Sequence, residues 1–271
     1  MRNSLYCTSE NNSALATTYP WGEGMMDARR NRHSSRNMAE PTIAPLYPLA
    51  APMGRQPEPT LLLPHDPVAE HIAAHLGAPA LFFHETQAGA IQVDIHVIGP
   101  TPAFPYVRLV TSGMSKRPMN VPDGAPPFAE LMLTLPASWQ LDEASMKEEK
   151  WYWPVALLRH LAHYPHEQKT WIGLGHSLPN GNPAKPYTDS VGFCGAIMLP
   201  PASAPEPFQS VMVDGKDVYF HCVVPMFKEE LNLARRRGFE ELLHKFNEKN
   251  VTDVVDPARK NTAKKKFLGL F

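Results

Sequence analysis

The stretch YVRLVTSGMSKRPMN, residues 106–120, decides how the chain folds, because a strand pattern runs directly into a sharp corner. Side chains of residues 106–111 alternate as they do along a strand. Gly113 allows a turn conformation that is costly for other residues, and Pro118 keeps the following chain extended. Ser112 and Ser115 are expected to satisfy free backbone donors in the turn. The stretch is therefore explained as a structural corner that needs no chemistry.

Two methionines flank the turn. Met114 and Met119 are adaptable apolar residues that suit either a sealed core or a contact with a partner. We favour core sealing.

Strand patterns continue on both sides of the corner. AIQVDIHVIG (90–99) alternates cleanly, with Ile91, Val93, Ile95 and Val97 on one face, and FAELMLTLP (128–136) continues the pattern. Four further segments are predicted as strands: TWIGLGH (170–176), FCGAIMLP (193–200), FQSVMV (208–213) and DVYFHCVVPM (217–226). A half-buried sheet with antiparallel pairs is expected, so the predicted fold class is α+β with one mixed, largely antiparallel sheet flanked by helices.

Helices are predicted in three places. Asp66 can cap a helix that starts at Pro67 and ends at Gly77. WPVALLRHLAHYPHE (153–167) places Pro154 in a first turn and Pro165 as the stop. Two closing helices, 227–237 and 239–250, meet at Gly238.

The chain divides into three regions. Residues 1–60 are polar, basic and rich in proline, with no sustained period, so we expect a disordered extension and translation starting at Met38. Residues 61–255 are predicted to form the folded domain, and residues 256–271 a basic tail. Residues 38–255 hold 16 basic and 23 acidic groups, although the whole chain has a net charge of −1. Such an acidic body disfavours nucleic acid and favours a basic partner.

Cysteine usage and hydropathy indicate the compartment. Cys7, Cys194 and Cys222 are too few and too scattered for a disulfide framework or a zinc site, so a cytoplasmic setting is predicted. Cys222 falls among apolar residues of a predicted strand and is interpreted as core filler. No apolar run reaches the length of about 18 residues that crosses a bilayer, and no signal peptide is recognised.

Two groups of residues have side chains suited to catalysis or metal binding. Asp94, His96, Arg108 and Glu130 lie on adjacent predicted strands and could converge, but a solvated or ion-paired face is favoured. His160, His163 and His166 form an HxxHxxH pattern, which Pro165 is expected to break before the third histidine. No phosphate loop, nucleophile elbow or dinucleotide motif is found, and no cofactor or metal is predicted.

Several unusual motifs occur in a characteristic order. They cover most of residues 65–265: VDIHVIGPT (93–101), PYVRLVTSGMSKRPMNVP (105–122), AELMLTLPASW (129–139), WPVALLRHLAHYPHEQKTWIGLGHSLPNG (153–181), CGAIMLPP (194–201), VVPMFKEELNL (223–233) and DVVDPARKN (253–261). In these motifs the chain resembles the suppressor-of-fused domain in its single-domain bacterial form.

The resemblance implies a mixed α/β domain that works by binding protein and not by catalysis. Bacterial members are proposed as immunity proteins of polymorphic toxin systems, which suggests a basic toxin domain as the partner. Extended segments of the partner are expected to add to sheet edges. Motif positions give the tentative partner-binding residues Thr111, Ser112, Gly113, Met114, Ser115, Met119, His176, Asn180 and Gly181. The alternative is a hydrolase or metal-dependent enzyme that uses the Asp94/His96/Glu130 face or the His160/His163/His166 cluster.

Overall fold

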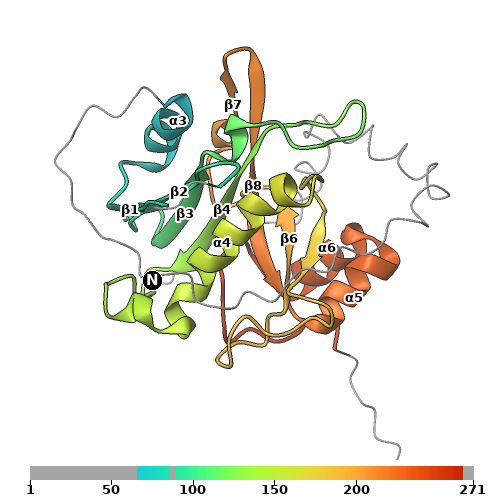
Figure 1. The fold of residues 1–271 in the computed structure, drawn as a ribbon. Helices are drawn as coiled ribbons and strands as arrows, with labels where there is room; N and C mark the ends of the chain where they lie inside the picture. The colour runs from blue at the N-terminus through green and yellow to red at the C-terminus, as the bar shows by residue number, and fades with distance from the viewer. Residues whose placement is uncertain (1–65, 86–88, 265–271) are drawn as a thin grey trace, which may run out of the picture. The chain divides into compact units, whose positions relative to one another are not determined.

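The computed structural model describes residues 66–85 and 89–264, which belong to one compact unit, Ile43–Phe271. The predictions for residues 1–60 and for a start at Met38 lie outside the described residues and stay predictions. Within the unit a central sheet is crossed by a long helix, α4 (Glu149–Glu167), as Figure 1 shows. The predicted α+β class, with one mixed and largely antiparallel sheet flanked by helices, is confirmed.

The described strands form one eight-stranded sheet in the order β1-β2-β3-β4-β8-β6-β5, and β7 pairs with β8. Every pair is antiparallel except β4 with β8. The strands are β1 (Leu81–Phe83), β2 (Asp94–Ile98), β3 (Tyr106–Ser112), β4 (Ala129–Pro136), β5 (Ser177–Pro179), β6 (Gly195–Leu199), β7 (Ser210–Val213) and β8 (Lys216–Met226). The other helices are α3 (Pro67–Leu76), α5 (Lys228–Arg237) and α6 (Phe239–Glu248), with short 3-10 turns η2 (Met114–Lys116), η3 (Ser145–Lys147) and η4 (Glu206–Gln209).

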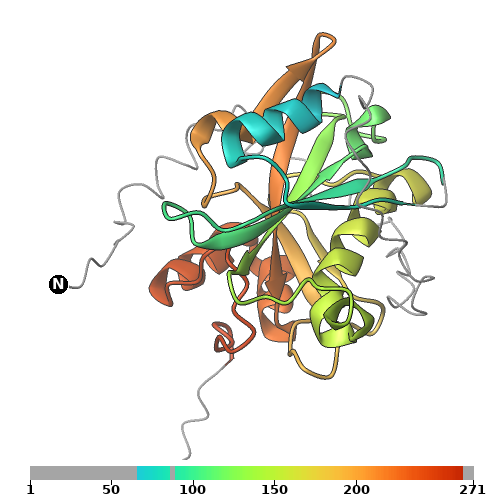
Figure 2. The same ribbon diagram turned by 90° about the vertical axis from the view of Figure 1, so that its left-hand side faces the viewer.

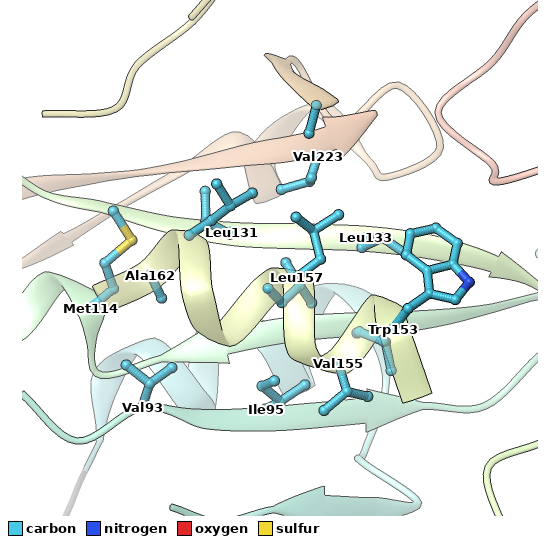
Figure 3. Packing of buried hydrophobic residues seen from close by; sticks show 14 of the residues in the cluster. Val93, Ile95, Met114, Leu131, Leu133, Trp153, Val155, Leu157, Ala162 and Val223 are labelled. Atoms are coloured by element: carbon cyan, nitrogen blue, oxygen red, sulfur yellow. The ribbon is translucent and has the colours of Figure 1, made fainter. Parts of the chain in front are cut away.

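Helices cover both faces of the sheet. The helix α4 packs its apolar stripe on one face, where Leu157 and Val155 meet Ile95 and Leu133 of the sheet (Figure 3). On the opposite face α3, α5 and α6 enclose a second core (Figure 2). The prediction that one face of the sheet is exposed to solvent was therefore wrong, because helices from separate parts of the sequence cover the second face.

The predicted ends of two helical regions are confirmed. Oδ1 of Asp66 accepts hydrogen bonds from the amides of Val68 at 3.0 Å and Ala69 at 3.3 Å, which caps α3. The helices α5 and α6 meet at Gly238, whose φ of 94° is a conformation that favours glycine.

Three local predictions were wrong. Pro154 does not lie in the first turn of its helix, because α4 starts five residues earlier, at Glu149. The helix α4 begins at Glu149 and continues through Pro165 to Glu167, so Pro165 is not its stop. Pro165 lacks one backbone donor, but the amide of Gln168 still donates to the Tyr164 carbonyl at 2.9 Å, so the last turn closes beyond the proline. The segment 170–176 is not a strand either. A turn around Gly175, with a φ of 78°, precedes the short strand β5.

Candidate partner-binding site

The corner after β3 is built around one carboxylate. Glu130 of β4 is fully buried, and its Oε2 accepts a hydrogen bond from Oγ1 of Thr111 at 2.6 Å. Its Oε1 accepts from the amides of Gly113 and Ser115, both at 2.9 Å, and from Oγ of Ser115 at 2.6 Å. Four donors from one short segment therefore fix the path of the chain between β3 and η2.

Burial and hydrogen bonding act on Glu130 in opposite directions. Burial raises the pKa of Glu130 and is the largest effect, while the hydroxyl and amide donors of the corner lower it in part. Thr111 Oγ1 also accepts the amide of Leu131 at 2.8 Å, which leaves its proton for Glu130. The carboxylate acts as an acceptor hub for the corner.

The two corner serines were expected to satisfy free backbone donors, and this prediction was wrong. Ser115 Oγ donates to Glu130, and Ser112 Oγ lies 2.8 Å from Nε2 of His96. Thr111 takes the predicted role instead, since it accepts a backbone amide. The difference arises because Glu130 and His96 come from other strands, and no local pattern places them beside the turn.

Gly113 and the methionines have structural roles. Gly113 has a φ of 113°, and a Cβ atom at this position would lie 2.1 Å from the carbonyl oxygen of Gln92. Met114 and Met119 are 0% and 5% exposed, so core sealing is confirmed. His166 Nε2 lies 3.1 Å from the Met114 carbonyl oxygen and ties η2 to the end of α4.

The polar sheet face is buried, and the prediction of a solvated or ion-paired face was wrong for three of its members. Glu130, Arg108 and His96 are 0%, 1% and 3% exposed. Only Asp94 has the expected character, with Oδ1 lying 3.2 Å from Nδ1 of the half-exposed His84. These three side chains are buried because the helices α3, α5 and α6 cover this face of the sheet.

These side chains do not converge on one point. Arg108 Nη2 donates to the Ser203 carbonyl at 2.7 Å, whereas Glu130 and His96 bind the corner. Burial lowers the pKa of His96 to about 4, so its ring is neutral near pH 7. Arg108, Glu130 and His96 thus each have a separate hydrogen-bond partner.

The three histidines of α4 also have separate environments. His163 Nε2 lies 2.8 Å from Oε1 of Glu85, and His166 bonds the Met114 carbonyl. His160 lines a small cavity together with Asn180. Across residues 66–85 and 89–264, no three His, Cys, Asp or Glu side chains are grouped as a metal site requires.

The second group of predicted residues surrounds β5. Asn180 Nδ2 donates to the carbonyls of Lys185 at 2.9 Å and Pro186 at 3.2 Å, so it shapes the loop that contains Gly181. The His176 ring packs edge-on against Trp171 at 4.1 Å between centroids, and burial lowers the pKa of His176. In the strand order, β8 and β6 separate this group from the corner on β3 and β4. The structure does not bring the two groups together.

Sequence reasoning missed a buried ion pair. Arg259 Nη1 and Nη2 lie 2.7 Å from Oε1 and Oε2 of Glu230, which is fully buried in the first turn of α5. Arg259 also donates to the Pro225 carbonyl at 2.8 Å, and the Thr262 amide donates to Glu230 at 2.8 Å. No local pattern reveals such a pair, because its members are 29 positions apart and one was assigned to the basic tail.

The ion pair anchors residues 253–262, which we call the latch segment. Upstream of Arg259, the Val255 amide donates to the Thr134 carbonyl at 2.8 Å, and Oδ2 of Asp253 accepts the Ser203 amide at 2.9 Å. The compact domain therefore continues beyond residue 255, into the region assigned to a tail.

Comparison with known proteins gives the family. A sequence model described as Suppressor of fused protein (SUFU) matches residues 89–260. A suppressor-of-fused homologue from Neisseria gonorrhoeae has a similar structure, with a TM-score of 0.51, 16% identity, and 73% of this chain and 96% of the other covered. A chain from the crystal structure of a Sufu–Fu complex also has a TM-score of 0.51, with 14% identity and coverages of 72% and 90%. No curated protein matches the sequence.

The two structures support the fold, and the sequence match extends over more than half of the chain. Its residues 89–260 include the corner, α4 and Arg259, which are the features described above. This chain belongs to the suppressor of fused family.

Proposed function

We propose that the domain is a non-enzymatic protein-binding module of the bacterial cytoplasm that acts as an immunity protein and neutralises a toxin. The observation that carries this proposal is membership of the suppressor of fused family. A protein of similar fold occurs in a complex described as Sufu–Fu, which is consistent with protein binding as the activity. The described part of the chain has no helix long and apolar enough to cross a bilayer.

Charge favours a basic toxin domain as the partner. Residues 38–255 carry seven more acidic than basic groups, and complementary charge speeds association in a salt-dependent way. Aromatic anchors carry much of the binding energy of typical interfaces. Phe82 and Phe104 are 37% and 39% exposed and supply anchors of this kind.

The edge at β1 suits an extended partner segment better than the edge at β5. On either side of β5, the carbonyl of His176 accepts the amide of Met198 in β6, and the amide of Asn180 donates to the carbonyl of Cys194 just before β6. By alternation the backbone groups of Ser177 and Pro179 point away from β6. Pro179 has no amide proton to offer a partner. At the other end of the described sheet, β1 carries Phe82 and pairs with β2.

The predicted partner-binding residues act indirectly in this proposal. Thr111 and Ser112 pair with Ile95 and Asp94 of β2, and β2 in turn supports β1. The corner formed by Thr111, Ser112, Gly113, Met114, Ser115 and Met119 would hold the β1 edge in shape, while His176, Asn180 and Gly181 shape the loop after β5.

Co-expression tests the proposal. The chain is expressed with the toxin encoded by a neighbouring gene, and growth rescue and co-elution on size exclusion are measured. Phe82→Asp should weaken the complex at least tenfold, whereas Met212→Asp, on the exposed strand β7, serves as the control. Failure to bind or rescue, together with stoichiometric zinc in the purified protein, would instead favour the enzyme alternative.

A further inference from the structure

The sheet divides beside β4. Strand β8 pairs with β4 from Ala129 to Met132 and then turns to pair with β6 from Cys222 to Met226. The second half of β4 is thereby left without β8 as its neighbour. Val254 occupies this position through a parallel bridge to Thr134, and the Val255 amide donates to the Thr134 carbonyl at 2.8 Å.

Beside β4, every second side chain of the latch segment is buried against the domain. Asp253 and Val255 are 7% and 3% exposed, while Val254 between them is less buried, which is the pattern of an extended chain. Oδ2 of Asp253 is held by the Ser203 amide at 2.9 Å. Main-chain pairing combined with alternate side-chain contacts is the usual way in which a sheet binds an extended peptide.

Arg259 provides the strongest contact of the segment. Its guanidinium forms two 2.7 Å bonds with the buried Glu230 and lies 4.8 Å from the centre of the Phe227 ring. A bidentate pair of this kind fixes both position and orientation. A partner without arginine at this point would leave the Glu230 carboxylate buried and unpaired, which is strongly unfavourable.

We propose that the latch segment is a ligand supplied by the chain itself, seated in a strand-pairing position on β4 that can accept an extended segment of another protein. That position selects a carboxylate at the first residue, a β-branched apolar side chain at the third and an arginine at the seventh, as in Asp253, Val255 and Arg259. Release of Arg259 from Glu230 frees the position. It is distinct from the β1 edge and does not depend on the toxin being the partner.

A synthetic peptide of residues 251–264 with a fluorescent label is the probe. It is added to the full chain carrying Arg259→Ala, and binding is followed by fluorescence anisotropy. Saturable binding at least tenfold tighter than to the wild-type chain is expected, because the peptide restores the pair with Glu230. The same peptide carrying the alanine should bind at least tenfold more weakly. Arg237→Ala is the matched control, because Arg237 pairs with Glu241 at 3.9 Å on the exposed surface of α5 and α6.

Amide hydrogen exchange gives a second readout. In the Arg259→Ala chain the Val255 amide should exchange at least tenfold faster than in the Arg237→Ala chain. Arg259→Lys, which keeps the charge but not the bidentate geometry, replaces the alanine variant if that variant does not fold. A folded variant that keeps wild-type protection at Val255 and does not bind the peptide would overturn the proposal. No toxin enters the experiment, so its outcome is separate from that of the co-expression test.

Discussion

Ser115 contacts Glu130 twice at one oxygen, with its hydroxyl at 2.6 Å and its amide at 2.9 Å from Oε1. The hydroxyl proton of Ser115 is thus donated to the carboxylate that also accepts the amide of the same residue. The corner is therefore a device for fixing backbone shape.

Glu130→Gln should destabilise the fold by about 2–4 kcal/mol, because the amide group brings donors to a site that already supplies four. Urea unfolding measures the change. Glu143→Gln, at a side chain that is 67% exposed, is the control and should remain within about 0.5 kcal/mol of wild type. Equal stability of the two variants would contradict the role given to Glu130.

Ser115→Ala should cost about 1.5–3 kcal/mol, since it removes one hydrogen bond to a charged group. Ser210→Ala on the exposed strand β7 is the comparison, and both are measured by thermal and chemical unfolding. If Ser115→Ala instead kept full stability and abolished a measurable turnover, the corner would be an active site.

Gly113→Ala should destabilise the chain by more than about 3 kcal/mol, because it combines an unfavourable φ with a Cβ atom 2.1 Å from the Gln92 carbonyl oxygen. Gly124→Ala separates the two effects. Gly124 has a φ of 82° but no neighbouring atom within 4 Å, so only about 1–2 kcal/mol is expected. A similar loss in both variants would show that the close approach to Gln92 is unimportant.

Stability should fall in mild acid because of His221. Burial lowers the pKa of His221 from 6.5 to about 4, and neither ring nitrogen has a hydrogen-bond partner among the described residues. Between these values the unfolded chain binds a proton that the folded chain does not. The contribution of His221 alone therefore lowers the free energy of unfolding by about 1.4 kcal/mol per pH unit as pH falls below 6.5, and His96, with a similarly lowered pKa, adds to it.

The variant His221→Phe lacks this titration. From pH 6.5 to 5 its stability relative to wild type should improve by about 2 kcal/mol in urea unfolding. Ser210→Ala, at an exposed residue that does not titrate, should differ from wild type by the same amount throughout this range. A constant difference between His221→Phe and wild type across this range would contradict the assignment.

Local patterns were enough to predict much of the fold. Asp66, Pro67 and Gly77 set the limits of α3, and the alternation at Ile95 and Val97 set the buried face of β2, because these signals depend only on near neighbours. The helix end predicted at Pro165 was wrong, since the last turn of α4 closes beyond the proline through the hydrogen bond from Gln168 to Tyr164.

Long-range contacts account for what the sequence did not reveal. Glu130 in β4 looked like a surface charge until the hydroxyls and amides of the corner were seen around it. Glu230 carries no local sign of its burial, because its partner Arg259 is remote in sequence. Polar residues that face buried partners carry the same local pattern as solvated ones, so only the assembled fold distinguishes them.

The bridge from Thr134 to Val254 also sets an order of events during synthesis. The two residues are 120 positions apart, and at about 5–20 residues per second the ribosome needs about 6–24 s to pass from one to the other. Until residue 255 has emerged, β4 lacks its last neighbour, and until residue 259 has emerged, Glu230 lacks its counter-ion. The nascent domain therefore cannot reach its native state until the latch segment has been synthesised.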